Sequence, residues 1–193
     1  MRSQKSLSED LPVVVVIVLA AGRGERFTAS GGTTHKLHAL LAGKRVIDHV
    51  LDAVKASGLA YHVVDADATR PGMGDSIAAG VRATPNAAAW LILPADLPLI
   101  TPGTLRRIAL APPRAITVAV YQGQRGHPVR FGTECAAALL NVKGNQGAAQ
   151  IMRGQAAINS IALIDVDDVG CVLDVDTLSD LARAEACLLR RQG

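Results

Sequence analysis

The distribution of apolar and polar residues along the chain predicts alternating strands and helices. Uninterrupted apolar runs at 13–18 and 90–93 are typical of buried parallel strands, whereas apolar residues at 46–54 recur with helical spacing that ends near Ser57-Gly58. The same criteria predict further strands at 60–65, 115–121, 128–131, 158–165 and 172–173, and further helices beginning near 77, 102, 133, 145 and 177. We therefore expect an α/β fold, a three-layer α/β/α sandwich around a Rossmann-like, mostly parallel sheet with a small hairpin insertion.

Length and composition narrow the class of protein. The 193 residues fit one well-buried domain, which we expect to span 12–193 after a polar, mobile tail at 1–11. With 49% hydrophobic but only 3% aromatic residues, the core is aliphatic and offers few aromatic platforms on which bases stack. The formal net charge is only +3, and most basic residues are scattered. These values favour a small anionic substrate over nucleic acid, which we do not expect as a partner.

Cysteine content and hydropathy favour a reducing compartment and no membrane partner. The three cysteines are odd in number and lack C-x-x-C spacing, so the sequence indicates neither a disulfide framework nor a zinc knuckle. The first apolar run, 13–21, is too short to span a bilayer, and Glu9-Asp10 before it argue against a signal peptide. We expect a cytoplasmic protein.

The first predicted strand ends in a glycine-rich loop that carries arginine. Gly22 and Gly24 allow backbone N–H groups to approach an anion closely. Arg23 and Arg26, together with Lys36 further along, supply positive charge, so the loop is predicted to bind phosphate. Neither the dinucleotide fingerprint nor the P-loop pattern fits, since the third glycine and the closing Gly-Lys-Ser/Thr are absent. The alternative is a tight strand-to-helix turn with solvated arginines.

Two later loops are further candidates for ligand contact. A second glycine-bearing loop, 72–76, leads into a helix whose free N–H groups offer another anion contact. The alternative is a capped helix start with Asp75 or Ser76 as the N-cap. The predicted hairpin carries Arg125 and His127, which either face a phosphorylated substrate or belong to a solvated turn.

Carboxylates stand at two positions where a metal ligand is expected. Asp96 follows a buried strand and lies at the sheet edge where α/β proteins bind ligands, although an Asx turn between two prolines is the alternative. Thr177 and Asp180 have the spacing of a capping box. We expect Asp174 and Asp176, just before it, to point to opposite sides of an extended segment. Only one of them is then expected to join Asp96, and Asp176 has helix capping as its alternative role.

In their order along the chain, these motifs resemble the MobA/MocA group of nucleotidyltransferases, most closely its MocA-like molybdenum cofactor cytidylyltransferase branch. The resemblance covers about 13–186 and rests on Leu19-Ala20-Ala21-Gly22-Arg23-Gly24-Glu25-Arg26-Phe27 with Lys36-Leu37, Gly72-Met73-Gly74-Asp75-Ser76-Ile77-Ala78-Ala79-Gly80-Val81, Leu93-Pro94-Ala95-Asp96-Leu97-Pro98, Arg125-Gly126-His127-Pro128-Val129 and Asp174-Val175-Asp176-Thr177. It implies the fold of nucleotide-diphospho-sugar transferases and transfer of a nucleoside monophosphate from CTP or GTP to the phosphate of molybdopterin. Mg²⁺ is the implied cofactor, pyrophosphate the leaving group, and a molybdoenzyme the recipient of the product.

Matched by position, the resemblance implies a role for each motif. The first glycine loop cradles the nucleotide, and the second holds base and ribose. Ala21 stands where guanylyltransferases of the group tend to have glycine, which favours CTP over GTP. No protein nucleophile or general base is needed, because the attacking phosphate is already ionised at neutral pH. The candidate residues are Lys36, Arg23, Arg26 and Asp96 for catalysis; Leu19, Ala20, Ala21, Gly22, Arg23, Gly24, Lys36, Gly72, Met73, Gly74 and Ser76 for the nucleotide; and Asp96, Asp174 and Asp176 for Mg²⁺.

Three departures from the family pattern keep alternatives open. Only one strand is predicted between the first long helix and Gly72, where the family has two strands with a helix between them. The loop at 28–35 is longer than usual and is a candidate lid, and the 144–149 segment lacks a carboxylate and a cation found in the family. The alternative functions are nucleotide transfer to another phosphorylated acceptor, such as a sugar phosphate, and a non-catalytic nucleotide-binding accessory role in molybdoenzyme maturation.

Overall fold

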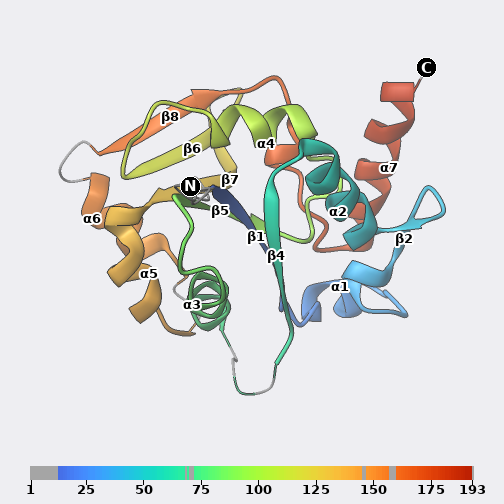
Figure 1. Ribbon diagram of the computed structural model, residues 1–193. Helices are drawn as coiled ribbons and strands as arrows, with labels where there is room; N and C mark the ends of the chain where they lie inside the picture. Colours follow the sequence, from blue (N-terminus) through green and yellow to red (C-terminus); the bar gives the residue numbers. More distant parts are fainter. Residues whose placement is uncertain (1–12, 68, 70–71, 145–146, 157–159, 193) are drawn as a thin grey trace, which may run out of the picture.

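The computed structural model describes residues 13–67, 69, 72–144, 147–156 and 160–192. The tail predicted for 1–11 lies outside the described residues. Figure 1 shows a central sheet with helices on both faces, which confirms the predicted α/β sandwich. Within the described part of the chain, no helix is both long enough and apolar enough to cross a membrane.

Six strands form the central sheet in the order β4-β1-β5-β7-β6-β8. β1 lies between β4 and β5 and is parallel to both, β8 is parallel to β6, and β7 is antiparallel to β5 and β6. The sheet is therefore mixed but mostly parallel, and the β6–β7 pair forms the predicted hairpin. The strands are β1 Val14–Ala20, β4 Ala60–Asp65, β5 Ala89–Pro94, β6 Ile116–Tyr121, β7 Gln124–Gly132 and β8 Ile161–Asp165.

Helices cover both faces because both faces of the sheet are apolar. Successive residues of β1 alternate between the two cores: Val16 and Val18 pack on the side of α2, α4 and α7, and Val15 and Ile17 on the side of α3, α5 and α6. The helices are α1 Glu25–Ala29, α2 Val46–Ser57, α3 Met73–Ala83, α4 Pro102–Ala109, α5 Ala136–Asn141, α6 Ala149–Ala156 and α7 Leu178–Gln192.

Two short segments differ from the prediction. β2 (Leu40–Leu41) and β3 (Lys44–Arg45) form a small hairpin that is too short to show a period-two pattern. The strand predicted at 172–173 is wrong, because the chain leaves a 3₁₀ turn, η4 (Val169–Cys171), at this point. The N–H groups of Val172 and Leu173 both donate back to the Val169 carbonyl, so they are not available to a neighbouring strand.

The start of α3 also differs from the prediction. The helix begins at Met73 with Gly72 as its N-cap, so neither Asp75 nor Ser76 caps it. The Asp75 carboxylate instead accepts a 3.0 Å hydrogen bond from the backbone N–H of Gly144. Asp75, in the first turn of α3, therefore connects this helix to the backbone at Gly144, which is distant in sequence.

The predicted caps of α4 and α7 are confirmed. Thr101 Oγ1 accepts a 3.2 Å hydrogen bond from the N–H of Thr104 at the start of α4. At α7, Thr177 Oγ1 accepts from the Asp180 N–H at 3.2 Å, and Asp180 accepts from the Asp176 N–H at 3.3 Å. Only the backbone of Asp176 takes part in this cap, which leaves its carboxylate for other contacts.

Candidate active site

A cavity of about 880 Å³ opens at the carboxyl ends of β1 and β5, the edge where open α/β sheets bind ligands. Its walls come from the glycine loop after β1 (residues 21–26), the start of α3, the β6–β7 hairpin and the segment at 171–176. The predicted site residues that line it are Leu19, Ala21, Gly22, Arg23, Gly24, Arg26, Lys36, Gly72, Met73, Ser76, Asp96, Asp174 and Asp176.

Two predicted nucleotide-binding residues lie outside this cavity. Ala20 is buried in the core on the α2 side, because alternate residues of β1 point to opposite faces of the sheet. Gly74 packs against backbone instead: a Cβ at this position would lie 2.8 Å from the carbonyl carbon of Lys143. The close packing of α3 on the neighbouring chain thus accounts for Gly74 without a ligand.

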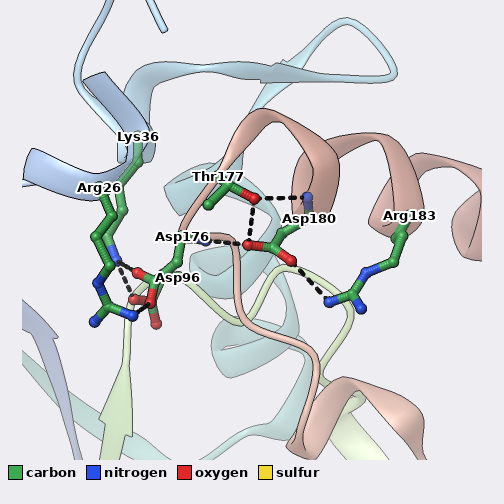
Figure 2. Close-up of polar contacts among 7 residues, drawn as sticks. All are labelled: Arg26, Lys36, Asp96, Asp176, Thr177, Asp180 and Arg183. Atoms are coloured by element: carbon green, nitrogen blue, oxygen red, sulfur yellow. Dashed lines mark hydrogen bonds and ion pairs between the residues drawn. The ribbon is translucent and has the colours of Figure 1, made fainter. Parts of the chain in front are cut away.

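Lys36 joins two carboxylates at the centre of the cavity wall. It begins the short 3₁₀ helix η1 (Lys36–His38), and its Nζ donates to Asp96 Oδ2 and to Asp176 Oδ1, each at 2.6 Å. Figure 2 shows the three side chains converging from separate parts of the fold. All three are largely withdrawn from solvent, with side chains 10%, 18% and 15% exposed for Lys36, Asp96 and Asp176. We call these three residues the lysine–carboxylate cluster.

The electrostatics of the cluster keep Lys36 charged. Burial lowers the pKa of Lys36, but its ion pairs and hydrogen bonds with Asp96 and Asp176 outweigh burial and raise the pKa above the ordinary lysine value. Burial also raises the pKa of Asp174, and the charges of Asp96 and Asp176 raise it further. Asp174 therefore lies close enough to the other two carboxylates to sense their charge.

The positions of Asp174 and Asp176 correct the prediction. Both residues line the cavity, while Val175 between them is fully buried in the core. The expectation that the two carboxylates face opposite sides is wrong, because residues two apart in an extended segment share one side and only the residue between them faces the other. Both carboxylates, rather than one, thus accompany Asp96.

The arginines of the glycine loop differ in their contacts. Arg26 pairs with Asp176 Oδ2 at 2.6 Å, although 79% of the Arg26 side chain is exposed. Arg23 lines the cavity, is 69% exposed and lies 3.5 Å from Glu25. Both cations are therefore available to phosphate groups that enter from solvent.

A histidine that the sequence reasoning left without a role fixes the shape of the glycine loop. His35 Nε2 lies 2.7 Å from the Gly22 carbonyl oxygen, which ties the loop to the residue before Lys36. Gly24 has φ of +69°, a left-handed conformation that favours glycine, and it caps α1 without a side chain. The adjacency of His35 to Lys36 was visible in the sequence, but no spacing rule indicated that its ring would reach back to Gly22.

The β6–β7 hairpin contributes Arg125 and His127 to the cavity, while Gln122 and Gly123 form its turn. Arg125 is exposed. Burial lowers the pKa of His127, so its ring is neutral at pH 7, and its Nδ1 atom has no hydrogen-bond partner among the described residues. The alternative of a solvated turn therefore applies to the exposed residues 122–125 at the tip of the hairpin and not to His127.

The carboxylate oxygens of Asp96 and Asp176 suit a divalent metal ion that is also bound by the phosphate groups of a substrate. Among the described residues, no three His, Cys, Asp or Glu side chains are grouped closely enough to hold a metal ion by themselves. The oxygens of Asp96 and Asp176 do converge on one point, now occupied by the Lys36 ammonium. Mg²⁺ and similar hard cations are commonly held by one or two carboxylates plus substrate phosphates and water. The cluster fits that pattern.

An open α/β sheet with a glycine loop and a lysine–carboxylate cluster at its carboxyl edge is the arrangement in which α/β proteins commonly bind phosphorylated ligands. The chain belongs to the MobA-like NTP transferase domain family, whose model matches residues 16–160. The fold and the family identify it as a nucleotidyltransferase-type protein, in agreement with the resemblance found from its motifs.

The chain is also similar to individual proteins over most of its length. The chain is 25% identical over 192 residues to the purine catabolism protein PucB of Bacillus subtilis strain 168, covering 86% of this chain and 93% of PucB. It resembles the crystal structure of Rv0371c from Mycobacterium tuberculosis H37Rv with a TM-score of 0.74 and 26% identity, covering 91% and 98% of the two chains. A nucleotidyl transferase from Methanothermobacter, Mth528, shares the fold with a TM-score of 0.79 at 22% identity, covering 93% and 99%.

Proposed function

We propose that the protein transfers a nucleoside monophosphate, from CTP in preference to GTP, to the phosphate of molybdopterin and releases pyrophosphate. Mg²⁺ is the proposed cofactor, the cytoplasm is the proposed location of the protein, and a molybdoenzyme is the proposed recipient of the product. The observation that carries the proposal is the convergence of Lys36, Asp96 and Asp176 beside the glycine loop. The family supports nucleotide transfer, while the pterin acceptor and the preference for CTP rest on the motif resemblance.

The reaction is an in-line displacement at the α-phosphorus of the nucleotide. An oxygen of the acceptor phosphate forms a bond to the α-phosphorus, and the bond from that phosphorus to the oxygen of the departing pyrophosphate breaks. Backbone N–H groups of the glycine loop bind phosphate oxygens, and Lys36, Arg23 and Arg26 offset the negative charge that develops on the leaving group. No side chain needs to remove a proton from the attacking phosphate.

Asp96 and Asp176 are the proposed metal ligands, with Asp174 next to them. A bound Mg²⁺ supplies charge neutralisation between two polyanionic substrates. The start of α3, where Gly72, Met73 and Ser76 line the cavity, is the proposed contact for base and ribose. The hairpin residue Arg125, which also lines the cavity, is the proposed contact for the acceptor.

The test is pyrophosphate release by the purified protein with Mg²⁺, molybdopterin, and CTP, GTP, ATP or UTP in separate reactions. We expect release that depends on molybdopterin and is fastest with CTP. Release with a sugar phosphate but not with molybdopterin would replace the proposed acceptor. Nucleotide binding without release under any of these conditions would contradict catalysis and favour the accessory role in molybdoenzyme maturation.

A further inference from the structure

We infer that Lys36 is the resident counter-ion of Asp96 and Asp176, and that a divalent metal binds these carboxylates only when nucleotide phosphate draws Lys36 away. This inference rests on the proposed function, since it assumes that metal and nucleotide share the cavity. It assigns Lys36 a second role besides phosphate contact. The metal and the nucleotide then enter as one unit.

The contacts show that Lys36 and a metal would compete for the same atoms. Lys36 Nζ lies 2.6 Å from one oxygen of Asp96 and 2.6 Å from one oxygen of Asp176, and both carboxylates are less than one-fifth exposed. A carboxylate withdrawn from water needs a cation or hydrogen-bond donors close to it. The ammonium already meets this need, so a metal ion alone gains little by replacing it.

The balance of charge around the cluster leads to the same result. Asp174, Asp96 and Asp176 line one cavity, and Lys36 is the buried cation that contacts two of them. Arg26 also pairs with Asp176, at 2.6 Å, but 79% of its side chain is exposed to solvent. Removing the Lys36 ammonium therefore leaves oxygens of Asp96 and Asp176 directed at one point with no buried cation between them, which is the donor set that hard divalent cations prefer.

The backbone around Lys36 allows this exchange to occur by side-chain movement alone. His35 holds the Gly22 carbonyl, and the N–H groups of His38 and Ala39 donate to the His35 carbonyl, so the turn that carries Lys36 is fixed to the glycine loop. The Lys36 side chain passes this loop, with its Cε 3.9 Å from where a Cβ of Gly22 would stand. Rotation about the side-chain bonds therefore brings Nζ from the carboxylates to a phosphate held by the loop.

The experiment measures binding of Mn²⁺, used as the probe metal, by calorimetry or by its electron paramagnetic resonance signal, with no acceptor present. For the wild-type protein, we expect weak Mn²⁺ binding alone and at least tenfold tighter binding with a CTP analogue whose α,β bridge does not cleave. For Lys36→Met, we expect at least tenfold tighter Mn²⁺ binding than wild type without nucleotide. An unchanged or weaker affinity in Lys36→Met would overturn the inference.

Three variants make the result specific. Lys36→Arg keeps the positive charge and should bind free Mn²⁺ as weakly as wild type. Lys44→Met removes a different cation, which pairs with Asp52 outside the cavity, and should leave Mn²⁺ binding unchanged. The double variant Lys36→Met/Asp96→Asn should lose the gain in affinity. A gain that survives the loss of Asp96 would place the metal elsewhere and contradict the inference.

Two further measurements distinguish an effect on Mn²⁺ affinity from an effect on protein stability or on pyrophosphate release. Lys36→Met removes the cation shared by Asp96 and Asp176 and leaves Asp176 paired with Arg26 alone. Thermal unfolding is therefore followed in parallel, and Mn²⁺ should raise the midpoint of this variant more than that of wild type. If wild type releases no pyrophosphate but Lys36→Met gains Mn²⁺ affinity, the proposed reaction fails and the competition stands. If wild type turns over and the metal affinity is unchanged in Lys36→Met, the competition alone fails.

Discussion

The backbone N–H of Val175 donates a 2.9 Å hydrogen bond to the backbone carbonyl of Asp96. This bond fastens the segment that follows β5 to the segment that precedes α7. Since Val175 is fully buried, Asp174 and Asp176 on either side of it turn toward the cavity, next to Asp96. One main-chain contact thus brings together carboxylates from two distant parts of the sequence.

The carboxylate of Asp176 is expected to be as important for activity as that of Asp96. We predict that Asp176→Asn lowers the rate of pyrophosphate release by about 10² to 10³, the usual effect of removing one group that stabilises developing charge. Asp176→Asn keeps the backbone N–H that donates to Asp180, so the cap of α7 remains. Asp52→Asn, an exposed carboxylate paired with Lys44, is the control and should leave the rate unchanged. Equal rates for wild type and Asp176→Asn would exclude Asp176 from the reaction.

Gly126 is expected to be required for the close contact between β7 and the segment at 171–176. A Cβ at Gly126 would lie 2.2 Å from the Cys171 carbonyl oxygen and 2.8 Å from the Val172 side chain. We therefore predict that Gly126→Ala destabilises the fold by about 1 to 3 kcal/mol and lowers activity, because the segment that carries Asp174 must shift. Urea unfolding and the pyrophosphate assay measure the two effects.

Gly154 provides the matched control for this glycine substitution. It lies in α6, and apart from its chain neighbours and the backbone of its own helix, no atom of the described residues stands within 4 Å of the place where its Cβ would be. Gly154→Ala should raise the free energy of unfolding by about 0.5 to 1 kcal/mol, because alanine loses less conformational freedom in a helix. Its activity should match wild type. A Gly126→Ala protein as stable and active as Gly154→Ala would contradict the packing argument.

Asp168 is expected to be the main buried carboxylate that stabilises the fold away from the cavity. It is 2% exposed and accepts hydrogen bonds from Thr101, Thr104, Gly170 and Arg191. Burial raises the pKa of Asp168, but these hydrogen bonds outweigh burial and hold the pKa below its ordinary value. We predict that Asp168→Asn lowers the free energy of unfolding at pH 7 by about 3 to 5 kcal/mol.

The effect of Asp168 on stability should depend on pH. Because its folded pKa lies below the unfolded one, the stabilisation is fully present above the unfolded value of about 4 and is lost as the pH falls through the folded value. The difference between wild type and Asp168→Asn in denaturant unfolding should therefore shrink between pH 5 and the acid limit. Asp48→Asn, which removes the partly exposed partner of Arg45, serves as the control. A difference that stays constant with pH would show that Asp168 does not act through its charge.

The sequence alone predicted the elements whose signals are local. Apolar runs of sufficient length gave the buried strands, and the caps at Thr101 and Thr177 followed from spacing within one helical turn. Segments of two residues, such as β2 and β3, carry no periodic signal and were missed. The motif order was sufficient to indicate the family, because it does not depend on contacts between distant residues.

The sequence by itself thus determined the α/β architecture, the glycine loop and the candidacy of Lys36 and Asp96. Only the tertiary structure decided that Asp174 and Asp176 share one cavity and that Lys36 holds two carboxylates together. The tertiary structure also decided that Ala20 and Gly74 do not line the cavity, because Ala20 is buried in the core and Gly74 packs against the backbone of Lys143. The physical reason is that side-chain direction in irregular segments is set by which residue the core buries, and here the core buries Val175.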